Sequence, residues 1–181
     1  MLSALAVLFE PTDIVELRVI HKAGSRGKRI DSGYFDHAHW SDLATHADRL
    51  NRQGAAVYVT LNPPDPQLLG RCCNRMQEFA KETTGDKNIL RRRWLLVDLD
   101  PTRPANTSAT PVQVEAAVSV ACSIFAETKR RGWGSPIVAQ SGNGMHLLYA
   151  IDLPNDAASE ALVKLVLAGL GEAFEIGRAH V

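Results

Sequence analysis

Two aspartates, Asp98 and Asp100, are one residue apart and follow a short apolar run, residues 94–97. Such a run closed by Pro101 predicts a buried strand, and side chains that alternate along a strand place both carboxylates on one face. Neighbouring carboxylates repel each other, and Mg²⁺ or Mn²⁺, which prefer oxygen ligands, relieve that repulsion. We therefore interpret Asp98 and Asp100 as metal ligands. The alternative is a solvated Asp98 and an Asp100 that caps the turn at Pro101.

A second polar stretch lies between the apolar segments 136–139 and 147–151, and it consists of Ser141, Gly142, Asn143, Gly144, Met145 and His146. Its glycines allow backbone amides to turn towards an anion, and His146, at the start of the next strand, is placed to contact a phosphate. We interpret these residues as a nucleotide-binding loop. The alternative is the glycine turn of an ordinary β-hairpin, with a histidine that has no function.

Together these stretches resemble the motifs of the archaeo-eukaryotic primase superfamily, in particular the primase-polymerases of bacteria, phages and mobile elements. That family has an apolar strand ending in Asp-x-Asp, then a small residue-x-His motif, then a third acidic residue on a later strand. Residues 95–100 match the first motif and residues 141–146 the second, whereas we find no convincing match to the third. The resemblance is strongest over residues 90–154 and extends to Thr-Leu-Asn-Pro at 60–63.

The resemblance implies an α+β fold over residues 1–174, with a mixed, mostly antiparallel sheet and an RRM-like catalytic core covered by helices. It implies template-directed nucleotidyl transfer from an NTP or dNTP, as in a DNA primase or primase-polymerase. The implied catalytic residues are Asp98 and Asp100, which would hold Mg²⁺ or Mn²⁺, and His146, which would contact the nucleotide's phosphates. The implied nucleotide pocket is shaped by Ser141, Gly142, Asn143 and Gly144. Expected partners are a single-stranded DNA template and a downstream helicase or other domain.

Further contacts to nucleotide and template are expected from local groups, because the formal net charge of the chain is zero. We interpret Arg103, in the polar loop 101–111, as a contact to the triphosphate. The expected template contacts are Arg91, Arg93, Lys28, Arg29 and Asn62. For the basic residues the alternative is a solvated or structural charge, and for Asn62 it is a helix cap.

The composition, with 45% apolar and 22% charged residues, is typical of one globular domain. Three cysteines give no disulfide framework, and the apolar N-terminus is too short to cross a membrane, so we expect a cytoplasmic protein without a membrane partner. Apolar patterning predicts one α+β unit. The expected helices cover residues 39–53, 66–83, 112–131 and 157–174, and the other expected strands cover residues 13–20, 30–35, 55–61, 136–139 and 145–151.

Residues 175–181 read Glu-Ile-Gly-Arg-Ala-His-Val, a heptapeptide that one reading frame of a widely used sequencing-library adaptor encodes. We therefore expect the natural sequence to end at about Phe174 and residues 175–181 to be a non-native tail. The catalytic domain would then be truncated at its C-terminus, which would explain the missing third acidic residue.

Two other functions stay open. Residues 98–102 also fit the Asp-x-Asp-x-Thr motif of haloacid-dehalogenase phosphatases, in which Asp98 would be the nucleophile and Asp100 the general acid. That motif normally lies near the chain start, and it leaves the glycine-histidine stretch unexplained. The other possibility is a non-catalytic, replication-associated nucleic-acid-binding module whose carboxylates are structural, and which would show no metal-dependent nucleotide binding.

Overall fold

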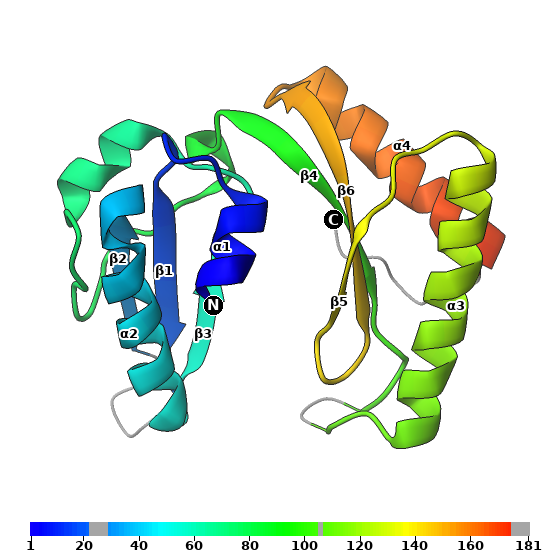
Figure 1. The fold of residues 1–181 in the computed structure, drawn as a ribbon, viewed down its shortest axis with the longest axis horizontal. Helices are drawn as coiled ribbons and strands as arrows, with labels where there is room; N and C mark the ends of the chain where they lie inside the picture. The colour runs from blue at the N-terminus through cyan, green and yellow to red at the C-terminus, as the bar shows by residue number, and fades with distance from the viewer. Residues whose placement is uncertain (22–28, 105–106, 175–181) are drawn as a thin grey trace. The chain divides into compact units, whose positions relative to one another are not determined.

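The computed structural model describes residues 1–21, 29–104 and 107–174 (Figure 1). The chain divides into two compact units, Met1–Arg91 and Arg92–Val181, and each has its own hydrophobic core. Helices and two small sheets with antiparallel pairing confirm the α+β class. The strands lie in two three-stranded sheets, ordered β2-β1-β3 and β4-β6-β5, where the sequence predicted one mixed sheet.

The sheet of unit 1 has β1 at its centre, paired antiparallel with both neighbours, so that Leu17 lies opposite Gly33 on β2 and Val59 on β3. Its strands are β1 (Val15–Ile20), β2 (Ile30–Phe35) and β3 (Ala56–Val59), and its helices are α1 (Leu2–Leu8), α2 (Trp40–Arg52) and the short 3₁₀ helices η1 (His37–His39), η2 (Pro66–Arg71) and η3 (Asp86–Asn88). Apolar side chains of β1 point towards α1 and α2 and form the core. The opposite face of the sheet carries the polar side chains of β1.

Helix α2 forms because apolar residues recur every three or four positions, at Trp40, Leu43, Ala47 and Leu50, and all four are buried against the sheet. Gly54 follows the helix with a φ of 84°, a left-handed conformation that glycine adopts without strain. The predicted helix over residues 39–53 is thus confirmed within one residue at each end.

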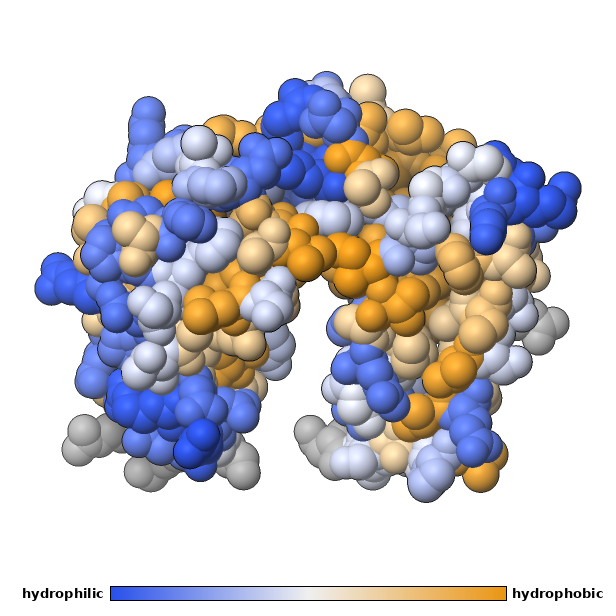
Figure 2. Space-filling view, viewed as in Figure 1, coloured by the Kyte–Doolittle hydropathy of each residue, from blue (hydrophilic) through white to orange (hydrophobic). Residues whose placement is uncertain are grey.

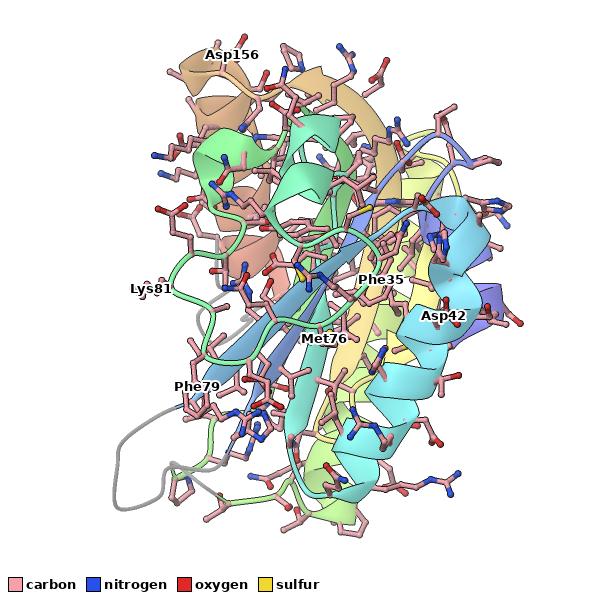
Figure 3. The ribbon with its side chains drawn as sticks, turned by 90° about the vertical axis from the view of Figure 1, so that its left-hand side faces the viewer. Phe35, Asp42, Met76, Phe79, Lys81 and Asp156 are labelled. Carbon is pink, nitrogen blue, oxygen red and sulfur yellow. The ribbon has the colours of Figure 1, made fainter. Side chains whose placement is uncertain are left out.

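The predicted helix over residues 66–83 is wrong beyond Arg71. Asn74 and Phe79 have φ values of 51° and 52°, which a right-handed helix cannot contain. The backbone instead pairs with β2, where Ser32 and Gln77 exchange two hydrogen bonds of 3.0 and 2.8 Å. Figure 3 shows this segment, with Met76 and Phe79 labelled, as an irregular chain beside the strands. Pairing with the edge of a sheet satisfied the backbone groups that a helix would have satisfied.

Unit 2 has the element order β-α-β-β-α, with β6 between β4 and β5 and running opposite to both (Figure 1). Its elements are β4 (Arg91–Leu99), α3 (Pro111–Arg130), β5 (Ile137–Gln140), β6 (Met145–Pro154) and α4 (Ala157–Phe174). This is the split β-α-β arrangement of RRM-like folds. Leu95, Val97 and Leu99 on β4, with Leu147 and Tyr149 on β6, form the core with α3 and α4.

Helix α3 begins with a full capping box. The Thr110 hydroxyl accepts a hydrogen bond of 3.3 Å from the Gln113 amide, and the Gln113 side chain accepts one of 2.9 Å from the Thr110 amide. Helix α4 is apolar on its exposed as well as its buried side, because Leu162 and Leu165 remain exposed, and Figure 2 shows apolar surface in the region of this helix. Within the described residues, no helix is both long enough and apolar enough to cross a bilayer.

Candidate functional site

The alternation of side chains along β4 determines where the two aspartates lie. Leu95, Val97 and Leu99 face the helices and are buried, so Asp98 lies on the opposite face of the sheet, with 23% of its side chain exposed. Asp100 follows the last residue of β4, and 42% of its side chain is exposed. Asp98 is thus fixed by a strand, whereas Asp100 is fixed by the loop that begins there.

Asp98 lies next to His146, the second residue of the neighbouring strand β6. The His146 Nε2 atom is 3.2 Å from Asp98 Oδ1, but the two groups are not aligned for a hydrogen bond. Asp98 Oδ1 is buried and has no hydrogen-bond partner among the described residues. A buried carboxylate oxygen without a donor is unfavourable, and a cation placed against it would stabilise its charge. The structure thus places Asp98 and His146, which were both predicted to be catalytic residues, next to each other.

Asp100 is paired with Arg103, three residues further along the loop. Both terminal nitrogens of Arg103 donate to Asp100 Oδ2, at 3.3 and 3.2 Å, and its Nε donates to the Thr107 carbonyl at 3.0 Å. The pair is partly buried, since only 18% of the Arg103 side chain is exposed. Arg103 was predicted to contact a triphosphate. In this structure it neutralises Asp100, a pairing that the i, i+3 spacing after a strand end could have indicated.

The loop between β5 and β6 is closed by its own serine. Ser141 Oγ accepts hydrogen bonds from the amides of Asn143 at 3.3 Å and Gly144 at 3.0 Å, and the Ser141 amide donates to the Gly144 carbonyl at 3.0 Å. Gly142 has a φ of 87°, which the turn requires. The Asn143 and Gly144 amides, which the sequence predicted to face an anion, thus donate to Ser141 instead.

The same loop packs closely against the end of β4. A Cβ atom on Gly144 would clash with the Leu99 carbonyl oxygen and would lie 2.8 Å from Asp100 Oδ1. Asn143 Oδ1 also accepts a hydrogen bond of 3.0 Å from the Ala109 amide, which ties the glycine loop to the segment that follows Asp100. The end of β4, the Arg103 loop and the glycine loop therefore meet at one place in unit 2. No sequence signal pointed to the Asn143–Ala109 contact.

The predicted template contacts belong to both units. Arg91 is exposed at the start of β4, and Arg93 is half-buried on the same strand. Arg29, in unit 1, pairs with Asp31 at 2.8 Å and Glu78 at 3.0 Å. Asn62 lines a cavity of unit 1, and Lys28 lies outside the described residues, as does the expected non-native tail 175–181.

The donor set for a metal ion is small. Within residues 1–21, 29–104 and 107–174, no group of three or more histidine, cysteine, aspartate or glutamate side chains is arranged to hold a metal. What the site offers is one buried oxygen of Asp98, which accepts no hydrogen bond within the described residues and lies 3.2 Å from His146, and one carboxylate on Asp100 that Arg103 neutralises. A cation at Asp98 would share Oδ1 with His146 Nε2, and a cation at Asp100 would require Arg103 to turn away.

Comparison with known protein families, with curated proteins and with solved structures found no match. The primase and phosphatase interpretations of Asp98 and Asp100 therefore both stay predictions, and function has to be argued from the site.

Proposed function

We propose that unit 2 carries a nucleotidyltransferase site of the DNA primase or primase-polymerase type. The site would add an NTP or dNTP to a strand paired with a single-stranded DNA template. The observation that carries the proposal is the buried Oδ1 of Asp98, which has no hydrogen-bond partner in the described part of the chain and lies 3.2 Å from His146. A downstream helicase domain and a cytoplasmic location belong to the same proposal.

Asp98 and Asp100 would hold Mg²⁺ or Mn²⁺ in this proposal. The ion would activate a 3′-hydroxyl and neutralise charge on the α-phosphate and the leaving pyrophosphate. Arg103 is placed to exchange partners, because its guanidinium can leave the exposed Asp100 carboxylate for a phosphate, to which it binds equally well. The same exchange would free Asp100 for the cation.

His146 and the glycine loop would bind the incoming nucleotide's phosphates. Ser141 Oγ already accepts two amide hydrogen bonds, so its own O–H remains available to donate to a phosphate oxygen. The contact of Gly144 with the end of β4 keeps this hydroxyl near Asp100. Because His146 is beside the Asp98 carboxylate, one histidine can contact both that acid and a nearby phosphate.

Primer synthesis on single-stranded DNA tests the proposal, with the intact protein, labelled NTP or dNTP, and Mg²⁺ or Mn²⁺. Asp98→Asn and Asp100→Asn should each lower synthesis by about a hundredfold or more, because a carboxylate that holds the ion supplies several kcal/mol of charge stabilisation. Glu115→Gln is the matched control, since Glu115 is an exposed carboxylate on α3 rather than on β4 or the loops that form the site. Mn²⁺ binding, followed by electron paramagnetic resonance, should weaken in the two Asp variants only. Full synthesis by both Asp variants would refute the metal-site assignment.

A second candidate function is a nucleic-acid-binding module without catalysis. It is favoured by the lack of a three-ligand group among the described residues and by the Arg103–Asp100 pair. This candidate expects single-stranded DNA binding that is the same with and without Mn²⁺, and no Mn²⁺-dependent binding of nucleotide by the wild-type protein. The primase proposal expects nucleotide binding that depends on Mn²⁺ and is lost in Asp98→Asn.

A further inference from the structure

A cavity of about 420 Å³ lies in unit 1, on the face of the sheet opposite α2. Its floor is made by Glu16 and Arg18 of β1 and by Tyr58 of β3, the residue opposite Arg18 in the strand register. Thr60, just beyond β3, also lines it. Leu17 and Val19, the alternate residues of β1, face the core on the other side of the sheet. The sequence predicted a buried strand over residues 55–61, whereas in the structure one face of this segment lines an open cavity.

The charged groups of the floor neutralise each other. Glu16 is fully buried, and each of its oxygens accepts two hydrogen bonds: Oε1 from the Ser32 hydroxyl at 2.6 Å and Arg18 Nε at 3.3 Å, and Oε2 from Arg18 at 2.8 Å and the Thr84 amide at 3.1 Å. Arg18 also donates to the Thr84 carbonyl at 2.6 Å. Asp86 adds a negative charge to the lining. The cavity is therefore not built to attract a polyanion by charge.

Its remaining groups suit a flat, uncharged ring that forms hydrogen bonds. The side chain of Tyr58 is 54% exposed, so its ring is open to stacking. Thr60 Oγ1 is buried without a hydrogen-bond partner in the described chain, and rotation about χ1 would exchange it with the methyl group and turn it to a ligand. Within the described residues, Arg18 donates through Nε and Nη2 to Glu16 and Thr84, and its Nη1 is left to donate to a ligand. An aromatic ring with hydrogen-bonding groups on a sheet face is how many domains bind bases.

We propose that this cavity binds one base of a single-stranded nucleic acid, stacked on Tyr58 and hydrogen-bonded by Thr60 and Arg18. Base binding needs neither metal nor nucleotidyl transfer. The further role of the cavity, as a site for the template strand, rests on the proposed primase function. The phosphates of the strand would then be contacted elsewhere, since the floor itself is neutral.

The test compares two fluorescently labelled oligonucleotides of equal length, one of ordinary single-stranded DNA and one abasic, without metal or nucleotide. Both carry the same phosphates, and only the first carries bases. By fluorescence anisotropy, Tyr58→Ala should bind the ordinary strand about tenfold more weakly, the effect of losing one stacked base, and the abasic strand unchanged. Thr60→Val, which keeps shape but removes the hydroxyl, should weaken binding of the ordinary strand about fivefold.

Val7→Ala is the control, because Val7 is an exposed apolar residue of α1 in unit 1 and does not line the cavity. It should bind both strands like the wild-type protein. Wild-type affinity of Tyr58→Ala for the ordinary strand would overturn the proposal, and so would an equal loss for both strands. The thermal unfolding temperature of Thr60→Val should equal or exceed that of the wild-type protein, and this measurement checks that the variant is folded. If Asp98→Asn and Asp100→Asn both kept full synthesis while Tyr58→Ala lost base binding, the primase function would fall and the base site would stand.

Discussion

At Gly144 the glycine loop comes so close to β4 that any side chain would meet the Leu99 carbonyl oxygen and the Asp100 carboxylate. Gly144→Ala should therefore push the loop away from the strand end and cost about 1–3 kcal/mol of unfolding free energy, the usual cost of overpacking. Urea unfolding measures this cost. Under the proposed function, nucleotide binding should be lost as well.

Gly134→Ala is the control for this experiment, because a Cβ there meets no atom within 4 Å and the residue has no positive φ. It should leave unfolding and nucleotide binding unchanged. Equal stability of Gly144→Ala and the wild-type protein would show that the loop is free to move off the end of β4.

The sequence predicted Asp98, Asp100 and His146 as site residues, but it did not predict which groups they contact. They were singled out because an apolar strand leads into each motif. The period of side chains along a strand predicts the face on which each residue lies, whereas the adjacency of β4 and β6 comes from the fold. Asn143 bonds to the Ala109 amide across 34 residues, a contact that depends on the folded course of two loops and leaves no periodic trace. Tyr58 was not singled out, because residues 55–61 were predicted to be a buried strand, and Thr60 was noted only as part of the Thr-Leu-Asn-Pro stretch at 60–63.

Among the elements of unit 1, β2 is joined to the irregular segment after Arg71 by one buried carboxylate. Asp31 accepts hydrogen bonds from the Phe79 amide at 3.0 Å and from two nitrogens of Arg29 at 2.8 Å each. Burial raises the pKa of Asp31, but the bonds from Arg29, Phe79 and His21 outweigh it and leave the pKa below its usual 3.8. Asp31→Asn should cost about 2 kcal/mol, the range for hydrogen bonds to a charged group.

This cost should depend on pH in a defined direction. The folded protein holds Asp31 ionised more strongly than the unfolded chain does, so its stabilisation is complete above pH 3.8 and is lost as pH falls through the lower, folded pKa. Chemical unfolding across this acid range should show the wild-type protein converging on Asp31→Asn. Glu78→Gln is the control, because the Glu78 side chain is 69% exposed and its pair with Arg29 contributes little. A pH-independent difference would contradict the assignment.

The elements themselves were predictable where their signal was periodic. Residues 157–174 were expected to be helical and form α4 over that range, and Thr110 caps α3 as its position before Pro111 indicates. The failure over residues 66–83 has a tertiary cause. The polar and apolar residues of this segment have spacings that suit a helix. However, β2 is an edge strand with unpaired backbone groups, and the backbone of Gln77 forms hydrogen bonds with it.

At the scale of the whole molecule, the strands of the two sheets are similar in sequence. Neither a change in composition nor a linker therefore indicated that the chain divides into two units. The cores, however, are built from different residues: Leu43 belongs to the buried cluster of unit 1, and Val97 to that of unit 2. Two cores that share no residue predict two regions that open separately. The division therefore has an energetic consequence that can be measured.

Hydrogen exchange followed by mass spectrometry measures whether the two units open separately. Leu43→Ala removes a fully buried side chain and should cost about 2–5 kcal/mol. Amides of residues 1–91 should lose protection in this variant, while those of α3 and β6 keep the wild-type rate. Val97→Ala, from the fully buried Val97 of β4, should give the reverse pattern. Protection lost equally throughout the chain by either variant would show instead that the two cores unfold as one cooperative structure, and that the separate sheets do not mark separate folding units.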